Sequence, residues 1–260
     1  MSDTRAPLTK VAVLIPTYNE RENVPLIVGR VRATTPEVDV VILDDASPDG
    51  TGEVADALAA KDPQVHVVHR EGKAGLGAAY LHGFAWARER GYDAVVEMDA
   101  DGSHRPEHLP AMLAAAGTAD VVIGSRWIKG GEVVNWPTIR KAISVGGNVY
   151  TKAMLGMPVN DATGGYRVYR MTALDAMGLG DVASQGYCFQ IDLTRRALRA
   201  GLKVVEVPIS FVEREIGDSK MSGDIVQEAL KRITLWGLAY RGGQVRAAVA
   251  RRRKAQWHSL

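Results

Sequence analysis

The sequence predicts an α/β protein with a mainly parallel sheet flanked by helices, and two patterns lead to this prediction. Short apolar runs rich in β-branched residues alternate along the chain with helical segments. Polar motifs directly follow several of these runs. Strands that alternate with helices at this spacing pair in parallel through right-handed crossovers, and ligands of such sheets lie beyond the carboxyl ends of the strands. We therefore expect one ligand crevice at that edge of the sheet.

The elements of the first half follow one another in regular alternation. Val11 to Ile15 is a continuous apolar run of the kind found in buried strands, and Pro16 ends it. Pro106 stands where helix starts accept proline. The predicted strands are 11–15, 38–43, 65–69, 94–98 and 121–124, and the predicted helices are 22–33, 51–60, 78–90 and 106–116.

The second half is less regular. Its composition predicts loops over 127–136 and 160–167, helices over 138–155, 189–200 and 223–240, and a strand over 204–212 that Pro208 interrupts. Neither an internal repeat nor a low-complexity linker divides the chain. We expect a short N-terminal tail over 1–9, a single domain over 10–240 and a basic C-terminal tail over 241–260.

The composition is that of a folded protein. Hydrophobic residues make up 46% of the chain and charged residues 24%, which excludes wholesale disorder. A net charge of +2 gives no nucleic-acid signature, so we expect no nucleic-acid partner. Cys188 is the only cysteine, which leaves no disulfide within the chain and indicates a reducing compartment.

No segment predicts a membrane span. Residues 1–10 are polar and lack the apolar core of a signal peptide. No run approaches the roughly 20 apolar residues of a spanning helix, and charged residues such as Glu228 and Lys231 interrupt the best candidate, 225–240. The tail after residue 240 is basic, which fits either a solvated tail or contact with an anionic membrane surface.

Two carboxylates follow the fourth predicted strand. Asp99 and Asp101 are one residue apart, so strand geometry would point both side chains to the same side. Their oxygens suit a hard divalent cation, Mg²⁺ or Mn²⁺, which often also holds phosphates. The same pattern occurs in ordinary turns and helix caps. Other motifs at predicted strand ends, 16–20, 44–45 and 124–126, favour the ligand site because they would meet at the same edge.

These motifs, taken in order, resemble a known family. Pro16-Thr-Tyr-Asn-Glu20, Asp44 to Gly50, Gly75-Leu-Gly77, Asp99-Ala-Asp101 and Gly124-Ser-Arg126 resemble glycosyltransferase family 2, which has the Rossmann-like GT-A fold. Segments 98–107, 161–167 and 213–220 resemble its branch of dolichol-phosphate mannose synthases, or polyprenol monophosphomannose synthases. The resemblance spans about residues 10 to 236. It implies a nucleotide-sugar half over 10–126 and an acceptor half over 127–240 with a helical extension.

The resemblance also implies the residues that bind the nucleotide sugar. It places the nucleoside at one end of the crevice, and Mg²⁺ or Mn²⁺ with the diphosphate at Asp99 and Asp101. Tyr18 could instead pack in the core, Glu20 could cap a helix, and Asp44 could support its own turn. The implied set is Pro16, Tyr18, Glu20, Leu43, Asp45, Asp99, Ala100, Asp101, Arg126, Arg214 and Lys220.

The acceptor implied by the resemblance is a polyprenyl phosphate, with Arg126, Arg140 and Ser144 at its phosphate. A phosphate monoester is already anionic near neutral pH, so it needs positioning and charge screening rather than a strong base. Arginine suits bidentate phosphate contact, although a single arginine is just as well a solvated helix residue. The implied reaction transfers mannose from GDP-mannose with inversion, and its catalytic residues are Asp99, Asp101 and Arg126.

Further residues carry looser expectations. Asp161 and Arg167 would orient the arginine pocket, while Gln190 and Asp192 would face the sugar. His104 would be either a third metal ligand or a structural residue. Family 2 enzymes that use UDP-sugars, for example for glucose transfer, and a non-catalytic nucleotide-binding subunit remain alternatives, although the intact carboxylates and arginines argue against the subunit.

We expect peripheral attachment at the cytoplasmic face of a membrane. The amphipathic C-terminal helix with its basic tail and an apolar loop would make this contact. A membrane-anchored partner protein is the alternative. The loop residues expected at the membrane are Trp127, Ile128, Val133, Val134 and Trp136.

Overall fold

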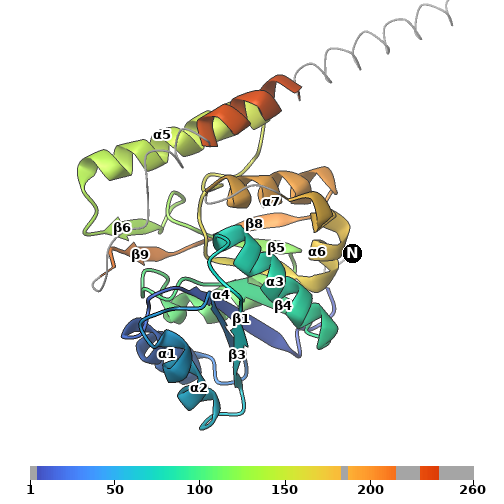
Figure 1. The fold of residues 1–260 in the computed structure, drawn as a ribbon. Helices are drawn as coiled ribbons and strands as arrows, with labels where there is room; N and C mark the ends of the chain where they lie inside the picture. The colour runs from blue at the N-terminus through green and yellow to red at the C-terminus, as the bar shows by residue number, and fades with distance from the viewer. Residues whose placement is uncertain (1–4, 183–186, 215–228, 240–260) are drawn as a thin grey trace, which may run out of the picture.

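The computed structural model describes residues 5–182, 187–214 and 229–239. At its centre is a sheet with the strand order β3-β2-β1-β4-β7-β5-β8 (Figure 1). Neighbouring strands pair in parallel except at β7, which is antiparallel to both β4 and β5. This arrangement confirms the α/β prediction. The strands are β1 (Val11–Thr17), β2 (Asp39–Asp44), β3 (Val65–His69), β4 (Ala94–Glu97), β5 (Val121–Ser125), β7 (Arg167–Arg170) and β8 (Val204–Pro208).

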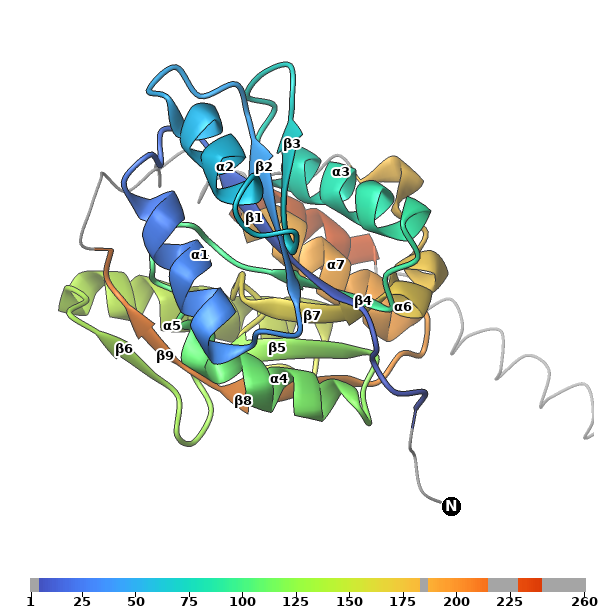
Figure 2. The same ribbon diagram turned by 90° about the horizontal axis from the view of Figure 1, so that it is seen from below.

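Helices cover both faces of the sheet (Figure 2). One face packs against α1 (Asn23–Thr34), α2 (Thr51–Ala59) and, after the short η1 (Pro106–His108), α4 (Leu109–Ala116). The other packs against α3 (Leu76–Glu89), α6 (Met171–Met177), which η2 (Leu179–Asp181) follows, and α7 (Tyr187–Arg199). Neighbouring strand residues such as Val13 and Leu14 belong to opposite cores and are both fully buried. Burial on both faces explains the continuous apolar runs of the strands.

Strand β7 and helix α6 were missed by the sequence analysis, which ended a loop at Arg167. The guanidinium of Arg167 is fully buried and donates to the backbone oxygens of Ala162, Gly164 and Gln190. A strand that begins and ends with arginine does not match the apolar pattern of a central strand. Tertiary contacts satisfy these charges, so local pattern alone gave no sign of the strand.

Pro208 marks a change of sheet rather than an interruption of one strand. Strand β8 ends there, and β9 (Ser210–Val212) leaves the main sheet to pair in parallel with β6 (Glu132–Val134). Strand β6 lies inside the segment predicted as the loop 127–136. The predicted strand over 204–212 is therefore two strands, which connect the main sheet to the two-stranded sheet of β6 and β9.

A pair of helices lies apart from the sheet, side by side in Figure 1. They are α5 (Thr138–Leu155), which matches the predicted helix, and the helical residues 229–239. The hydroxyls of Tyr150 and Thr234 hydrogen-bond across the pair at 2.7 Å. The described residues do not include Lys220, the remaining residues of the predicted helix 223–240 or the predicted C-terminal tail. The predicted N-terminal tail is described only from residue 5.

The turn at Gly131 is packed against the end of β5, which predicts a measurable cost for a methyl group there. A Cβ at Gly131 would overlap the Ser125 carbonyl oxygen and come within 2.9 Å of the Arg126 carbonyl carbon. We expect Gly131→Ala to lower the free energy of unfolding in urea by about 1–3 kcal/mol, because backbone atoms must move.

The matched control is Gly146→Ala in α5, where no atom lies within 4 Å of the added Cβ. Alanine favours a helix interior, so this variant should be stabilised by roughly 0.5–1 kcal/mol or be unchanged. Equal urea midpoints for wild type and Gly131→Ala would contradict the close packing at this turn.

Candidate active site

The polar motifs meet at the carboxyl edge of the sheet, as the sequence predicted. Strands β2, β1 and β4 are direct neighbours, so the residues that follow them line a single crevice. The Asp45 amide donates to the Thr17 carbonyl at 3.0 Å, which joins the ends of β1 and β2. Arg126 follows β5 on the other side of β7.

Asp99 and Asp101 lie together in this crevice. The Asp99 side chain is 36% exposed, whereas that of Asp101 is 6% exposed. Asp101 accepts from the Ser103 hydroxyl at 2.6 Å and from its amide at 3.0 Å, and it pairs with Arg214 at 2.7 Å. Burial raises the pKa of Asp99, and the carboxylates of Asp101 and Glu20 raise it further against the opposing effect of His104.

The ligand type of this pair, two carboxylates, suits a hard divalent cation. Carboxylate oxygens are preferred ligands of such a cation, and a cation would relieve the repulsion that Asp101 exerts on Asp99. Among the described residues, no group of three or more His, Cys, Asp and Glu side chains could hold a metal ion. A cation at Asp99 and Asp101 would therefore need further oxygen ligands, such as those of a bound diphosphate.

His104 has a structural position. Its Nδ1 accepts the Asp99 amide at 3.0 Å, and its ring stacks on Tyr166 with centroids 5.1 Å apart. Phe211 contacts the ring edge-on, and the imidazole is almost completely buried. These contacts occupy Nδ1 and fix the backbone of Asp99, which supports the structural alternative over that of a metal ligand.

The end of the crevice around Tyr18 and Asp45 contains two cations, Arg70 and Lys73. Lys73 Nζ lies 4.4 Å from the ring centroid of the half-buried Tyr18, and Arg70 pairs with Asp45. Glu20 accepts from the Asn23 amide group at 2.7 Å. Arg70 and Lys73 stand in the loop after β3, where no motif marked them.

The last two residues of β2, Leu43 and Asp44, do not point into the crevice. Asp44 accepts from the hydroxyls of Ser47 at 2.6 Å and Thr17 at 3.2 Å, which supports its alternative role in the turn. The Leu43 side chain is fully buried in the core facing α3. The Leu43 side chain therefore does not line the crevice.

Arg126 is held in a buried bidentate ion pair with Asp161. Its Nε and Nη2 donate to the two carboxylate oxygens at 2.7 Å each, and Nη2 also donates to Thr163 at 2.9 Å. Burial alone would raise the pKa of Asp161, but the Arg126 guanidinium outweighs it and holds that pKa below the usual range. Arg167 fixes the same loop through the carbonyls of Ala162 and Gly164. Both residues therefore orient the arginine, as expected.

Aromatic rings complete the surroundings of Arg126. The guanidinium carbon lies 5.7 Å from the Trp127 ring centroid, 5.5 Å from Trp136 and 5.4 Å from Phe211. The indole Nε1 atoms of both tryptophans are buried. Both rings therefore pack beside this cation while remaining half-exposed, and the predicted membrane contact of Trp127 and Trp136 stays a prediction. Ile128, Val133 and Val134 are also only half-exposed.

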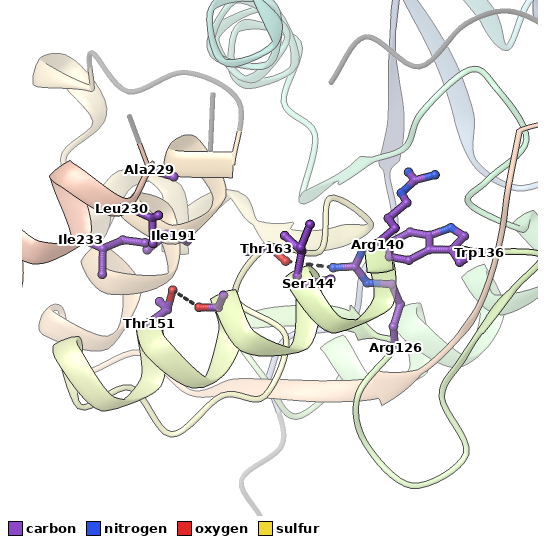
Figure 3. A pocket seen from close by; sticks show the side chains of 12 residues that line it. Arg126, Trp136, Arg140, Ser144, Thr151, Thr163, Ile191, Ala229, Leu230 and Ile233 are labelled. Carbon is purple, nitrogen blue, oxygen red and sulfur yellow. Dashed lines mark hydrogen bonds between the residues drawn. The ribbon is translucent and has the colours of Figure 1, made fainter. Parts of the chain in front are cut away.

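A groove with an empty volume of about 630 Å³ opens beside Arg126, between α5 and residues 229–239. Figure 3 shows Arg126, Arg140 and Trp136 at one end and Ile191, Leu230 and Ile233 at the other. The structure thus brings all three predicted acceptor-phosphate residues to the polar end of one apolar groove. Its lining is Arg126, Trp136, Arg140, Ile143, Ser144, Gly147, Thr151, Thr163, Ile191, Ala229, Leu230 and Ile233.

Gln190 and Asp192, which were expected to face the sugar, both contact other side chains of the protein. Gln190 donates to the buried Glu97 at 2.8 Å, and burial together with the charge of Asp99 raises the pKa of Glu97 to about 8. Asp192 pairs with Arg195 at 2.6 Å and Arg196 at 3.1 Å on its own helix. Glu97 stands inside an apolar strand, so no sequence pattern marked it.

The fold and crevice together define an α/β protein of the nucleotide-binding class, with a carboxylate pair and cationic side chains beyond the strand ends. The chain belongs to glycosyl transferase family 2, whose family model matches residues 12–178. It is therefore a glycosyltransferase, and the predicted family is confirmed.

Curated relatives cover almost the whole chain. An undecaprenyl-phosphate mannosyltransferase of Micrococcus luteus is 58% identical over 238 residues, which is 92% of this chain and 98% of the relative. A polyprenol monophosphomannose synthase of Mycolicibacterium smegmatis is 54% identical over 248 residues, or 95% and 94% of the two chains.

A solved structure supports the fold at lower identity. Glucosyl-3-phosphoglycerate synthase from Mycobacterium tuberculosis, crystallised with Mn²⁺ and UDP-glucose, superimposes with a TM-score of 0.63 at 20% identity. The match covers 90% of this chain and 79% of that one. It confirms the predicted GT-A architecture.

The Arg126–Asp161 pair predicts a pH-dependent contribution to stability. Asp161→Asn would leave a buried guanidinium without its counter-ion, so we expect a loss of about 3–5 kcal/mol at pH 7. Because the folded pKa of Asp161 is lowered, this contribution is complete above the unfolded pKa of about 3.9 and is lost as the pH falls through the folded pKa. Urea unfolding of both proteins should show the difference shrinking by about 1 kcal/mol per unit below pH 4.

The variant Asp62→Asn serves as a control, since Asp62 forms a more exposed pair with Arg32. It should cost no more than about 1 kcal/mol. A wild-type advantage over Asp161→Asn that stayed constant from pH 7 to pH 3 would contradict the assignment.

Proposed function

We propose that this chain transfers mannose from GDP-mannose to the phosphate of a polyprenol. The observation that carries the proposal is the apolar groove with Arg126, Arg140 and Ser144 at its polar end, beside the carboxylate crevice. A long apolar chain with an anionic head fits such a groove. The names of the two close relatives, one a polyprenol monophosphomannose synthase and the other an undecaprenyl-phosphate mannosyltransferase, support the same acceptor and sugar.

On the donor side, Pro16, Tyr18, Glu20, Asp45 and backbone atoms of Leu43 would hold the nucleoside. Tyr18 offers a flat ring, and the carboxylates accept hydrogen bonds from hydroxyl or base N–H groups. Lys73 lies over the same ring and would add a cation near the donor.

The diphosphate would lie at Asp99, Ala100 and Asp101. Mg²⁺ or Mn²⁺ held by Asp99 and Asp101 would neutralise charge on the departing GDP. Arg214, which now pairs with Asp101, would turn to the donor phosphates, and Lys220, outside the described residues, would assist it.

On the acceptor side, Arg126 and Arg140 would position the lipid phosphate. Its oxygen is already anionic near neutral pH, so no general base is required. That oxygen forms a bond to the anomeric carbon while the bond to GDP breaks and its electron pair leaves with GDP, which inverts the configuration. The ion pair with Asp161 fixes Arg126 in advance, so little reorganisation is needed when charge develops.

We further propose that the helix pair meets the membrane on its cytoplasmic face. No helix in the described part of the chain is long and apolar enough to cross a bilayer. Large apolar side chains are nevertheless exposed on these helices, beside the mouth of the groove, which would let a lipid acceptor enter from the membrane. They are Ile139, Ile143, Val145, Val149, Leu230, Leu235 and Leu238.

The decisive test is transfer of radiolabelled mannose from GDP-mannose to a polyprenyl phosphate. We expect divalent-cation-dependent transfer that EDTA abolishes, and a loss of about 100-fold in Asp101→Asn, or about 2.7 kcal/mol of transition-state stabilisation. The exposed Asp56 of α2 supplies the control Asp56→Asn, which should retain full activity. Undiminished transfer by Asp101→Asn would remove this carboxylate from the proposed site.

Calorimetric titration with GDP and UDP in the presence of Mn²⁺ tests the donor. GDP should bind more tightly. Tighter binding of UDP would overturn GDP-mannose as the donor and favour a UDP-sugar.

Flotation with anionic liposomes tests the membrane contact. Ile139 and Val149 are 69% and 62% exposed, so Ile139→Ser with Val149→Ser should leave folding intact. Removing two apolar side chains from the contact should reduce bound protein by roughly 10-fold or more. The control Leu26→Ser changes a residue of α1 that is 57% exposed, and it should float like wild type. If wild type does not float, a membrane-anchored partner replaces direct attachment.

A further inference from the structure

The buried side chain of Asn148 joins α5 to the loop before β7. The structure describes every residue of α5, and the buried ones lie in its C-terminal half, namely Asn148, Thr151 and Leu155. Arg140 and Ser144 stand about two turns and about one turn before Asn148 on the same helix. Asn148 is therefore the first buried residue of α5 after the two that are expected at the acceptor phosphate.

Asn148 and Arg126 contact the same side chains of that loop. The Asn148 Nδ2 group donates to the Thr163 hydroxyl at 3.1 Å and lies 3.5 Å from Asp161 Oδ1. Arg126 Nη2 donates to the same two oxygens at 2.9 Å and 2.7 Å, and Figure 3 shows its bond to Thr163. Asn148 Oδ1 in turn accepts the Ala162 amide at 2.8 Å. The loop is thus held from β5 by Arg126 and from α5 by Asn148.

The Thr163 hydroxyl uses all of its hydrogen-bonding capacity in this network. A hydroxyl has one donor and two acceptor lone pairs. Thr163 accepts from Arg126 and Asn148 and donates to Asp161 Oδ1 at 3.3 Å. Asn148 is only 5% exposed, so water does not readily replace it there. A shift of α5 relative to Arg126 would therefore break a hydrogen bond at a buried site, which is unfavourable.

We propose that Asn148 is a positioning residue, which fixes Arg140 on α5 relative to Arg126 at the end of β5. A phosphate that contacts both arginines requires them at one distance from each other, and hydrogen bonds that set this distance in advance reduce the cost of binding. The described lining of the groove does not include Asn148, so it acts through Thr163 rather than on the ligand itself. This inference rests on the proposed function, because it takes an isoprenoid phosphate as the ligand of the two arginines.

The test measures binding of farnesyl phosphate, a soluble isoprenoid phosphate, to the full chain by calorimetry. Asn148→Ala should weaken this binding by about 10-fold, the effect expected when one buried hydrogen bond no longer holds the two arginines in place. Binding of GDP with Mn²⁺ should change less than about twofold, because the proposed nucleoside and metal residues follow β1, β2 and β4 rather than α5. In mannose transfer, KM for a polyprenyl phosphate should rise by about 10-fold, whereas KM for GDP-mannose should stay within about twofold.

The matched control is Lys152→Met. Lys152 follows Asn148 by about one turn of α5 and donates from an exposed side chain to Asn160 at 2.9 Å, so it joins the same helix to the same loop. This variant should bind farnesyl phosphate and GDP like wild type. Equal weakening of farnesyl phosphate binding by Lys152→Met would contradict a specific role of Asn148.

Thr163→Val tests whether Asn148 acts through the shared hydroxyl. Valine has a shape close to that of threonine but lacks the hydroxyl. The double variant Asn148→Ala with Thr163→Val should bind farnesyl phosphate within about twofold of the weaker single variant, whereas independent effects would multiply. Partial unfolding of a variant would lower the number of binding sites in the titration and leave their affinity unchanged, so it is distinguishable from lost positioning.

Three further results would overturn the inference. They are unchanged affinity of Asn148→Ala for farnesyl phosphate, equal weakening of farnesyl phosphate and GDP binding, and multiplied effects in the double variant. If wild type transfers mannose, any of these removes the inference and leaves the proposed function standing. If wild type transfers no mannose but Asn148→Ala selectively loses affinity for farnesyl phosphate, mannose transfer is removed and the positioning role stands.

Discussion

The buried ion pair between Arg126 and Asp161 is the interaction on which the rest of the site depends. A guanidinium is costly to bury, and only a bidentate partner with additional acceptors offsets this cost. Asp161 is itself fixed, because its amide donates to Glu206 of β8 at 2.9 Å. The pair therefore ties the end of β5 to the loop before β7 and places a cation in a fixed position at the apolar groove.

Charge is divided between the two sides of the crevice. The carboxylates of Glu20, Asp99 and Asp101 gather beyond β1 and β4, where burial and their mutual repulsion raise the pKa of Asp99. The cations Arg126 and Arg140 stand at the polar end of the apolar groove. This separation matches a reaction in which a diphosphate departs from one side while a phosphate arrives from the other. Between the two sides, Glu213 pairs with Arg140 and Arg214 pairs with Asp101.

Local sequence pattern predicted the strands and helices of the first half of the molecule, because there each apolar run is a buried strand. Buried parallel strands are apolar on both faces, and their polar ends must share one edge, so the crevice and the presence of Asp99 and Asp101 in it were predictable. Strand β7 was not, because the charge of Arg167 is satisfied only by carbonyls from other segments. The packing of Trp127 and Trp136 beside Arg126 was not predictable either, because sequence alone does not show which side chains meet there.

The sequence by itself determined the order of the strands and helices in the first half, the edge of the sheet at which ligands gather and the family of the protein. Only the tertiary structure decided the partner of each charged side chain. It paired Arg126 with Asp161, Arg140 with Glu213 and Arg214 with Asp101. The physical reason is that strand and helix periodicity arises from neighbours a few residues apart, whereas the partners of Arg126, Arg140 and Arg214 come from distant segments that meet only after the core has formed.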